Sequence, residues 1–154
     1  MRTTPFRVAV AGLALVAIAL AATPATAPAT LDALFPAGRL TLPLAELAEK
    51  FPLAAGKDFQ VSEIGRDAQT SQHVVWIVDR EVPHRHDTHD LFVVMVRGYG
   101  TMRLGAEERP VGAGSILYVP RGTPHAFRNE SGAPALAYAV YFPAFDGADR
   151  VTVD

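Results

Sequence analysis

Short apolar runs and polar turn residues alternate along most of this chain. The runs at 59–64, 72–79, 91–96, 101–104, 116–119, 126–128 and 135–142 are rich in β-branched and aromatic residues. Such runs predict strands, and turn residues separating them at roughly 8–12-residue intervals favour a β-sandwich or barrel. The run at 91–96 is apolar throughout, which predicts a strand buried on both faces. We therefore expect an all-β domain over residues 59–145.

The segment before this domain has a different pattern. Apolar residues at helical spacing lie within residues 43–51, where Pro43 suits a first helical turn and Pro52 ends the pattern. We expect one short helix there and assign residues 28–58 to a linker with that helix. Residues 146–154, after the last predicted strand, are expected to form a C-terminal tail.

The first 27 residues resemble a secretory signal peptide. Arg2 and Arg7 precede an apolar run at 8–22, and small residues follow up to Ala27. A basic start, an apolar run and a small-residue cleavage site are the features of such a signal. The run is shorter than the roughly 20 residues of a membrane span. We expect a secreted or periplasmic protein with no stable membrane span after cleavage.

Composition narrows the classes of function. The chain of 154 residues has no cysteine, which excludes disulfides and thiolate metal ligands or nucleophiles. Its formal net charge is −2 and it has no basic run, so nothing favours a nucleic-acid partner. The candidate chemistry must come from histidines, carboxylates and hydroxyls.

Three histidines make a candidate metal site. His84 and His86 are two residues apart, so on a strand their side chains point to the same face. Asp90 follows closely, and His125 begins a later predicted strand. Imidazole is the commonest protein ligand for transition metals, and burying three unpartnered rings would be costly. We predict that these residues hold a divalent metal.

Two motifs resemble those of the cupin superfamily. The second motif matches at Gly114, Pro120, Gly122, His125 and Asn129, with each fixed residue at the expected spacing. The first motif matches in its His-x-His pair, the acidic residue after it and the closing Gly98. This resemblance, over roughly residues 59–142, implies a cupin-type jelly-roll β-barrel. We expect the motif glycines to adopt turn conformations and Asn129 to tie a turn.

The fourth metal ligand has three alternatives. Cupins usually place a glutamate seven residues before the closing glycine, and this chain has Leu91 there. Counting from His86 instead gives Asp90, our assigned ligand. His89 could also turn inward, or the site could have three histidines and no carboxylate. A carboxylate would favour Mn or Fe in an octahedral site, whereas three histidines alone suit tetrahedral Zn.

The resemblance leaves two kinds of function open. The first is a metal-dependent dioxygenase, isomerase or decarboxylase acting on a small oxygen-bearing molecule. The second is a non-catalytic barrel that binds or senses a sugar or organic acid. No catalytic group outside the metal site can be named from the sequence, and the resemblance also implies a homodimer. Six aromatic residues are candidates for the pocket wall: Trp76, Phe92, Tyr118, Phe127, Tyr138 and Tyr141.

Overall fold

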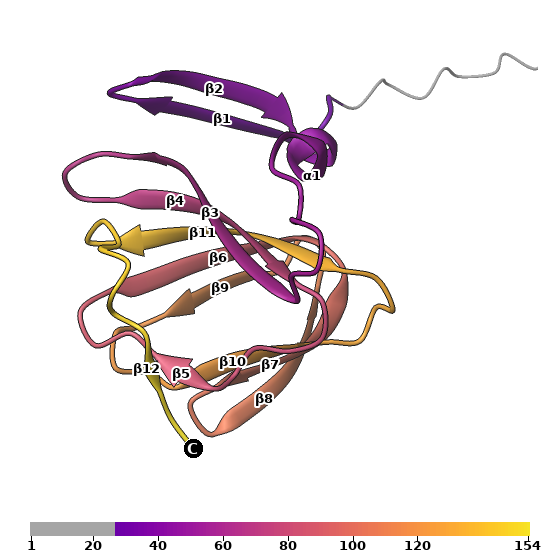
Figure 1. Cartoon of the computed structure of the whole chain (residues 1–154), viewed down its shortest axis with the longest axis vertical. Helices are drawn as coiled ribbons and strands as arrows, with labels where there is room; N and C mark the ends of the chain where they lie inside the picture. Colours follow the sequence, from indigo (N-terminus) through magenta and orange to yellow (C-terminus); the bar gives the residue numbers. More distant parts are fainter. Residues whose placement is uncertain (1–26) are drawn as a thin grey trace, which may run out of the picture.

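The computed structural model describes residues 27–154 as a barrel-like sandwich of two antiparallel sheets (Figure 1). The expected signal peptide lies outside the described residues apart from Ala27. No helix in the described part of the chain is long and apolar enough to cross a membrane.

Each of the two main sheets has five strands. The first has the order β3-β4-β11-β6-β9 and the second has the order β12-β5-β10-β7-β8. The strands of the first are β3 (Phe59–Arg66), β4 (Ser71–Ile77), β11 (Ala135–Phe142), β6 (Asp90–Arg97) and β9 (Ile116–Val119). Those of the second are β12 (Val151–Thr152), β5 (His84–Arg85), β10 (His125–Asn129), β7 (Tyr99–Leu104) and β8 (Glu107–Gly112). This arrangement confirms the all-β jelly-roll prediction.

The space between the sheets is filled from alternate strand positions. Because side chains on a strand alternate between faces, Val75 and Ile77 point inward while Val74 and Trp76 point outward. The inner cluster combines Met95, Met102, Phe127 and small alanines of β11, and it surrounds the cavity described below. Short alanine side chains leave room that larger residues would fill, which is one reason this core has a cavity.

A hairpin covers part of the outer face of the first sheet, and the sequence analysis missed it. Strands β1 (Thr30–Phe35) and β2 (Gly38–Pro43) pair in the segment assigned to the linker. The predicted helix follows as a 3-10 turn, η1 (Leu44–Glu46), and α1 (Leu47–Lys50). These elements pack on Trp76 and Leu136, so β4 is buried on both faces.

The C-terminal segment is also part of the fold. β12 pairs with β5, and the Val153 amide donates to the Pro83 carbonyl at 3.0 Å. Residues 146–154, expected as a C-terminal tail, therefore contribute a short strand to the second sheet. The segment crosses the opening between the two sheets before the C-terminus (Figure 1).

Strand β6 corrects another expectation. Leu91 and Met95 are buried, but Phe92 on the opposite face is 37% exposed, so β6 is not buried on both faces. The hairpin of β1 and β2 covers only the part of the sheet nearer β4. The hydrophobic run alone could not reveal where that cover ends.

Candidate metal centre

Three histidines converge inside the barrel from neighbouring strands. His84 on β5 and His125 on β10 are directly paired across the sheet, and His86 follows β5 on the same face. All three are buried, and one ligand nitrogen from each lies within 4.8 Å of the others. Nitrogens bound to one tetrahedral metal at about 2.1 Å lie roughly 3.4 Å apart, so small side-chain shifts would complete such a site.

Backbone carbonyls fix the orientation of all three rings. The Nδ1 atoms of His84 and His125 lie 3.0 Å from the carbonyls of Val82 and Thr123. The Nδ1 of His86 bonds to the Asp149 carbonyl. A carbonyl only accepts, so each Nδ1 carries the proton and leaves the Nε2 lone pair free for a metal.

The rings are kept neutral by their surroundings. Burial lowers the pKa of His84 to about 3, with the nearby charges of His125 and Arg150 adding to the effect. Burial also lowers the pKa of His125 to about 4 and that of His86 below its usual value. Neutral imidazole is the form that coordinates metals, so the group is ready to bind without first losing protons.

Asp90, assigned as the fourth ligand, is not brought into this group. Leu91 points inward, is 6% exposed and lines the cavity, so the preceding residue on the strand faces away. The Asp90 carboxylate instead accepts hydrogen bonds from the Arg121 guanidinium and backbone amide at 2.8–3.1 Å. These bonds lower the pKa of Asp90 to about 2. Strand parity thus favours the three-histidine alternative.

His89, the other alternative, is buried but has no free nitrogen. Its Nδ1 lies 2.6 Å from an Asp149 carboxylate oxygen, and its Nε2 lies 3.3 Å from the Ala144 carbonyl. Both nitrogens therefore lie beside oxygen atoms of the chain, and His89 is not among the histidines whose nitrogens converge. His89 supports the loop after His86 and supplies no ligand atom to the group.

Asp149 holds this end of the site together. Its carboxylate accepts hydrogen bonds from the amides of Asp87 and Thr88 at 2.8 and 2.9 Å, and from the Thr88 hydroxyl at 2.7 Å. Burial alone would raise the pKa of Asp149, but these bonds and the one from His89 outweigh it and hold that pKa low. The same residue positions His86 through its backbone carbonyl.

The cavity also contains a carboxyl group that neither sequence motif includes. Glu81 precedes the first motif and lines the cavity that the three histidines face. Its Oε2 accepts a hydrogen bond from the Phe127 amide at 3.0 Å. Burial raises the pKa of Glu81 to about 7, although the Phe127 amide and the Arg150 charge oppose the shift. A carboxyl with such a pKa can gain or lose a proton near neutral pH.

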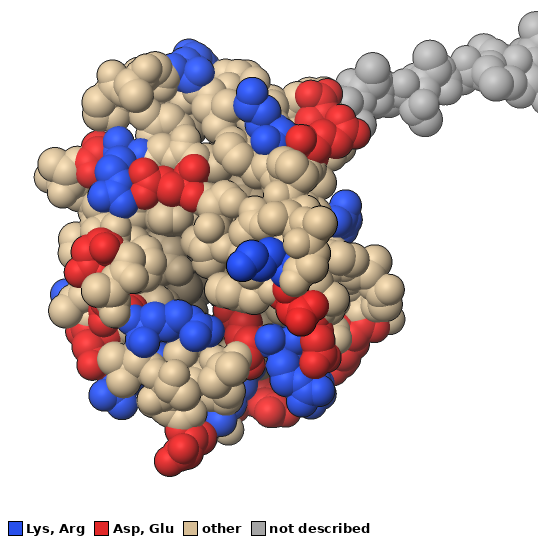
Figure 2. Space-filling model, viewed as in Figure 1, with Lys and Arg blue, Asp and Glu red and all other residues tan. Residues whose placement is uncertain are grey.

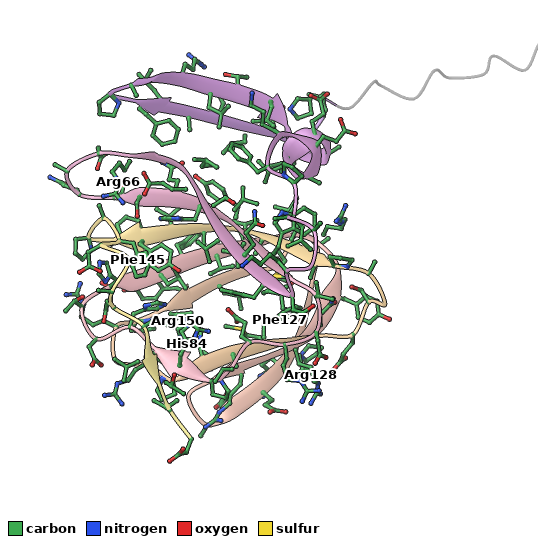
Figure 3. The ribbon with its side chains drawn as sticks, viewed as in Figure 1. Arg66, His84, Phe127, Arg128, Phe145 and Arg150 are labelled. Atoms are coloured by element: carbon green, nitrogen blue, oxygen red, sulfur yellow. The ribbon has the colours of Figure 1, made fainter. Side chains whose placement is uncertain are left out.

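Arg150 is the second charged group that lines the cavity. It is exposed at the mouth of the opening between the sheets, beside His84 (Figure 3). The rest of the lining is mostly apolar, and the cavity volume is about 80 Å³. One water needs roughly 10–15 Å³ by the same measure, so the cavity has room for a small molecule.

The aromatic candidates divide between three environments. Phe127 and Tyr141 line the cavity, as does Phe145, which stacks on Tyr141 with ring centroids 4.7 Å apart. Trp76 and Tyr138 instead pack under the N-terminal hairpin. Phe92 and Tyr118 are exposed on the outer face, 37% and 54% respectively.

The motif residues have the structural roles expected of them. Gly98, Gly114 and Gly122 all have positive φ, a backbone conformation that favours glycine. The side-chain amide of Asn129 donates to the carbonyls of Val78 and Ala133 at 2.8 and 2.7 Å, which ties the turn after β10. These residues shape the loops around the site.

The donor set fits a divalent metal. The Nε2 of His86 is buried and has no hydrogen-bond partner among the described residues. An unpaired buried nitrogen is costly unless a ligand satisfies it. His84, His86 and His125 would hold the ion, which would act as a Lewis acid toward an oxygen ligand.

Comparisons with known proteins agree with this architecture. A family model described as "Cupin domain" matches residues 75–141. A protein of Aquifex aeolicus (strain VF5) described as uncharacterized is 33% identical over 98 residues, covering 64% of this chain and 80% of that protein.

Solved structures share the fold at lower identity. TT1209 from Thermus thermophilus is 22% identical, with a TM-score of 0.57 over 63% of this chain and 94% of that one. PAC13 from Streptomyces, solved with uridine and described as a nucleoside dehydratase, is 18% identical, with a TM-score of 0.57 over 70% and 88%. KdgF from Halomonas sp. is 19% identical, with a TM-score of 0.57 over 65% and 94%. Residues 75–141 therefore match the cupin domain family, and these solved structures show that the chain shares its fold.

Proposed function

We propose that this protein is an exported metal-binding cupin that acts on a small oxygen-bearing molecule at a three-histidine site. The observation that carries the proposal is the shared orientation of His84, His86 and His125. Each Nδ1 faces a backbone carbonyl, and the Nε2 of His86 is buried without a partner among residues 27–154. Without an ion, the unpaired buried nitrogen costs free energy of folding. With an ion, the same nitrogen becomes a metal ligand in the correct orientation.

The raised pKa of Glu81 favours a catalytic function over simple binding. A bound divalent ion would polarise an oxygen of the substrate, and Glu81 in the same cavity has a pKa of about 7. Such a carboxyl can transfer a proton to or from a metal-bound molecule at neutral pH. Isomerisation and elimination both need a proton moved beside a polarised oxygen. Pac13 is described as a nucleoside dehydratase, an example of elimination chemistry on this fold.

The first experiment is to measure metal identity and stoichiometry by elemental analysis of tag-free protein spanning residues 28–154. We expect about one Fe, Mn or Zn per chain, and loss of most of it in His86→Ala and His125→Ala. Asp90→Asn is the matched control and should keep the ion, because its carboxylate is bonded to Arg121. Full metal content in both histidine variants would contradict the proposal.

A second experiment addresses catalysis and export. Glu81→Gln should keep the metal and lose turnover with small hydroxy- and oxo-carbonyl compounds, because an amide cannot exchange a proton. Export is supported by the pattern of residues 1–27 and is tested by N-terminal sequencing of protein recovered from the periplasm or medium. Protein found only in the cytoplasmic fraction would contradict export, and an intact Met1 on exported protein would contradict cleavage of the signal.

A further inference from the structure

We propose that Arg150 makes this cavity a site for a carboxylate-bearing ligand, with one oxygen group on the metal and a second, anionic group on the guanidinium. This inference rests on the proposed metal site and names the class of molecule it would take. Three features support it: the position of Arg150, the partners of its guanidinium, and the charge of the cavity once a metal is bound.

The first step is the position of Arg150. Its guanidinium carbon lies 5.5 Å from the centroid of the Phe59 ring, and the side chain lines the same cavity as the three histidines. Figure 3 places Arg150 next to His84 in the opening between the sheets, and in Figure 2 basic side chains lie beside a hollow on this face. Any molecule that enters the cavity by this opening passes the guanidinium.

The backbone beneath Arg150 is held firmly. The Asp149 carboxylate is fixed by four hydrogen bonds to the loop 87–89, and β12 begins at the next residue after Arg150. The Arg150 amide also donates to the Ala148 carbonyl at 2.9 Å. Because this backbone is already fixed, binding at Arg150 does not have to order a loop, which favours affinity.

The Arg150 guanidinium has few ion-pair or hydrogen-bond partners among the described residues. It takes part in none of the ion pairs found among residues 27–154. One guanidinium nitrogen lies 3.4 Å from the Val82 carbonyl and 3.2 Å from Nδ1 of His84. An arginine always carries its protons, so the contact with His84 is a hydrogen bond only if that Nδ1 is unprotonated.

The proton on Nδ1 of His84 rules out this hydrogen bond. Coordination through Nε2 requires the His84 proton to be on Nδ1, where it is donated to the Val82 carbonyl. Nδ1 can then no longer accept from Arg150. With a metal bound, the long contact to the Val82 carbonyl is therefore the one hydrogen bond of this guanidinium among the described residues.

The third step is the charge of the loaded cavity. Three neutral imidazoles leave a divalent ion at +2, and Arg150 adds a further positive charge. Glu81 is the one acidic residue among the described residues that line the cavity, and it cannot balance both. An apolar lining strengthens this imbalance, because charges are weakly screened there. A carboxylate matches the planar fork of arginine and supplies the missing negative charge.

The probes are succinate and its half-amide, succinamate, titrated calorimetrically into protein loaded with one equivalent of Zn²⁺. Both offer one carboxylate to the metal and they have the same size, so they differ only in the second anionic group. We expect succinate to bind more tightly than succinamate, and Arg150→Gln to weaken succinate binding about 10- to 100-fold. Succinamate binding should be unchanged in that variant.

Matched variants make the result specific. Arg150→Lys keeps a charge without the planar fork and should recover part of the succinate affinity. Arg109→Gln removes the same charge from β8, where Arg109 is paired with Glu107, and should have no effect. Equal binding of the two probes, or succinate binding that Arg150→Gln leaves unchanged in Zn²⁺-loaded protein, would overturn the inference. A wild-type chain that takes up no metal would instead overturn the proposed function.

Discussion

The raised pKa of Glu81 predicts a pH-dependent cost to stability that Glu81→Gln should remove. The glutamine is nearly isosteric, and its side-chain oxygen can still accept the hydrogen bond from the Phe127 amide. It cannot ionise, so the variant differs from the wild type chiefly in the buried charge. The comparison therefore isolates the titration of one group inside the cavity.

The magnitude follows from the two pKa values. The Glu81 pKa rises from 4.5 to about 7 on folding, mainly through burial. Each unit of difference corresponds to about 1.4 kcal/mol, so the full effect is about 3 kcal/mol. Between these values the folded state holds the proton more tightly than the unfolded state. The stabilisation is therefore complete below pH 4.5 and is lost as the pH rises through 7.

The assay is urea unfolding of metal-free protein at several pH values from 4.5 to 8. Trp76 is the single tryptophan and is buried against the hairpin, so its fluorescence should report global unfolding. The buried histidines have lowered pKa values and lose stability as the pH falls, the opposite trend. Their effect is common to both proteins and cancels in the difference between variant and wild type.

We expect Glu81→Gln to gain about 3 kcal/mol relative to the wild type between pH 4.5 and pH 8. Asp90→Asn is the control, because the Asp90 pKa of about 2 puts its titration below this range. Its difference from the wild type should be constant. A constant difference for Glu81→Gln as well would refute the raised pKa of this carboxyl in the cavity.

Three further predictions test how the rest of the structure supports the site. Asp149→Asn should weaken metal binding about 10- to 100-fold in competition with a chelator, because the loop that orients His86 loses its charged anchor; unchanged affinity would mean that the carboxylate does not position that ring. Leu136→Ala, at a residue 1% exposed beneath the hairpin, should lower the free energy of unfolding by about 2–5 kcal/mol and leave metal content intact. If the chain forms the expected homodimer through edge strand β9, Tyr118→Lys should give monomers in light scattering, since Tyr118 is exposed there; a dimer that survives the change would point to another interface.

The pattern of residues was sufficient to predict the β-barrel and to bring together the three histidines. Alternation and turn residues located seven of the strands because both are local properties of the backbone. The spacing of His84 and His86 placed them on one face, and the second motif placed His125 at the start of a strand that turned out to pair with β5. The glycines of the motifs adopt the positive φ that the turns require.

Strand parity was the first thing that only the tertiary structure decided. Asp90 and Leu91 are adjacent, and the two motif spacings disagree, because counting back from Gly98 gives Leu91 and counting on from His86 gives Asp90. In the sheet, where β6 pairs with β9 and β11, Leu91 points inward. Asp90 points the other way, and its carboxylate accepts a hydrogen bond from Arg121. Strands β5, β8 and β12 and the hairpin at 30–43 were missed because pairing with other strands, rather than local pattern, defines them.

The charged groups of the cavity were the second feature that only the tertiary structure decided. Glu81, Asp149 and Arg150 lie outside both motifs, and Asp149 and Arg150 lie more than 60 residues along the chain from His84 and His86. Taken alone, each is an ordinary surface residue type. Their roles depend on contacts through space, because burial and neighbouring charge set the pKa of a carboxyl and the partners of a guanidinium. The sequence by itself identified the three histidines that could hold a metal, and the tertiary structure decided which charged groups surround them.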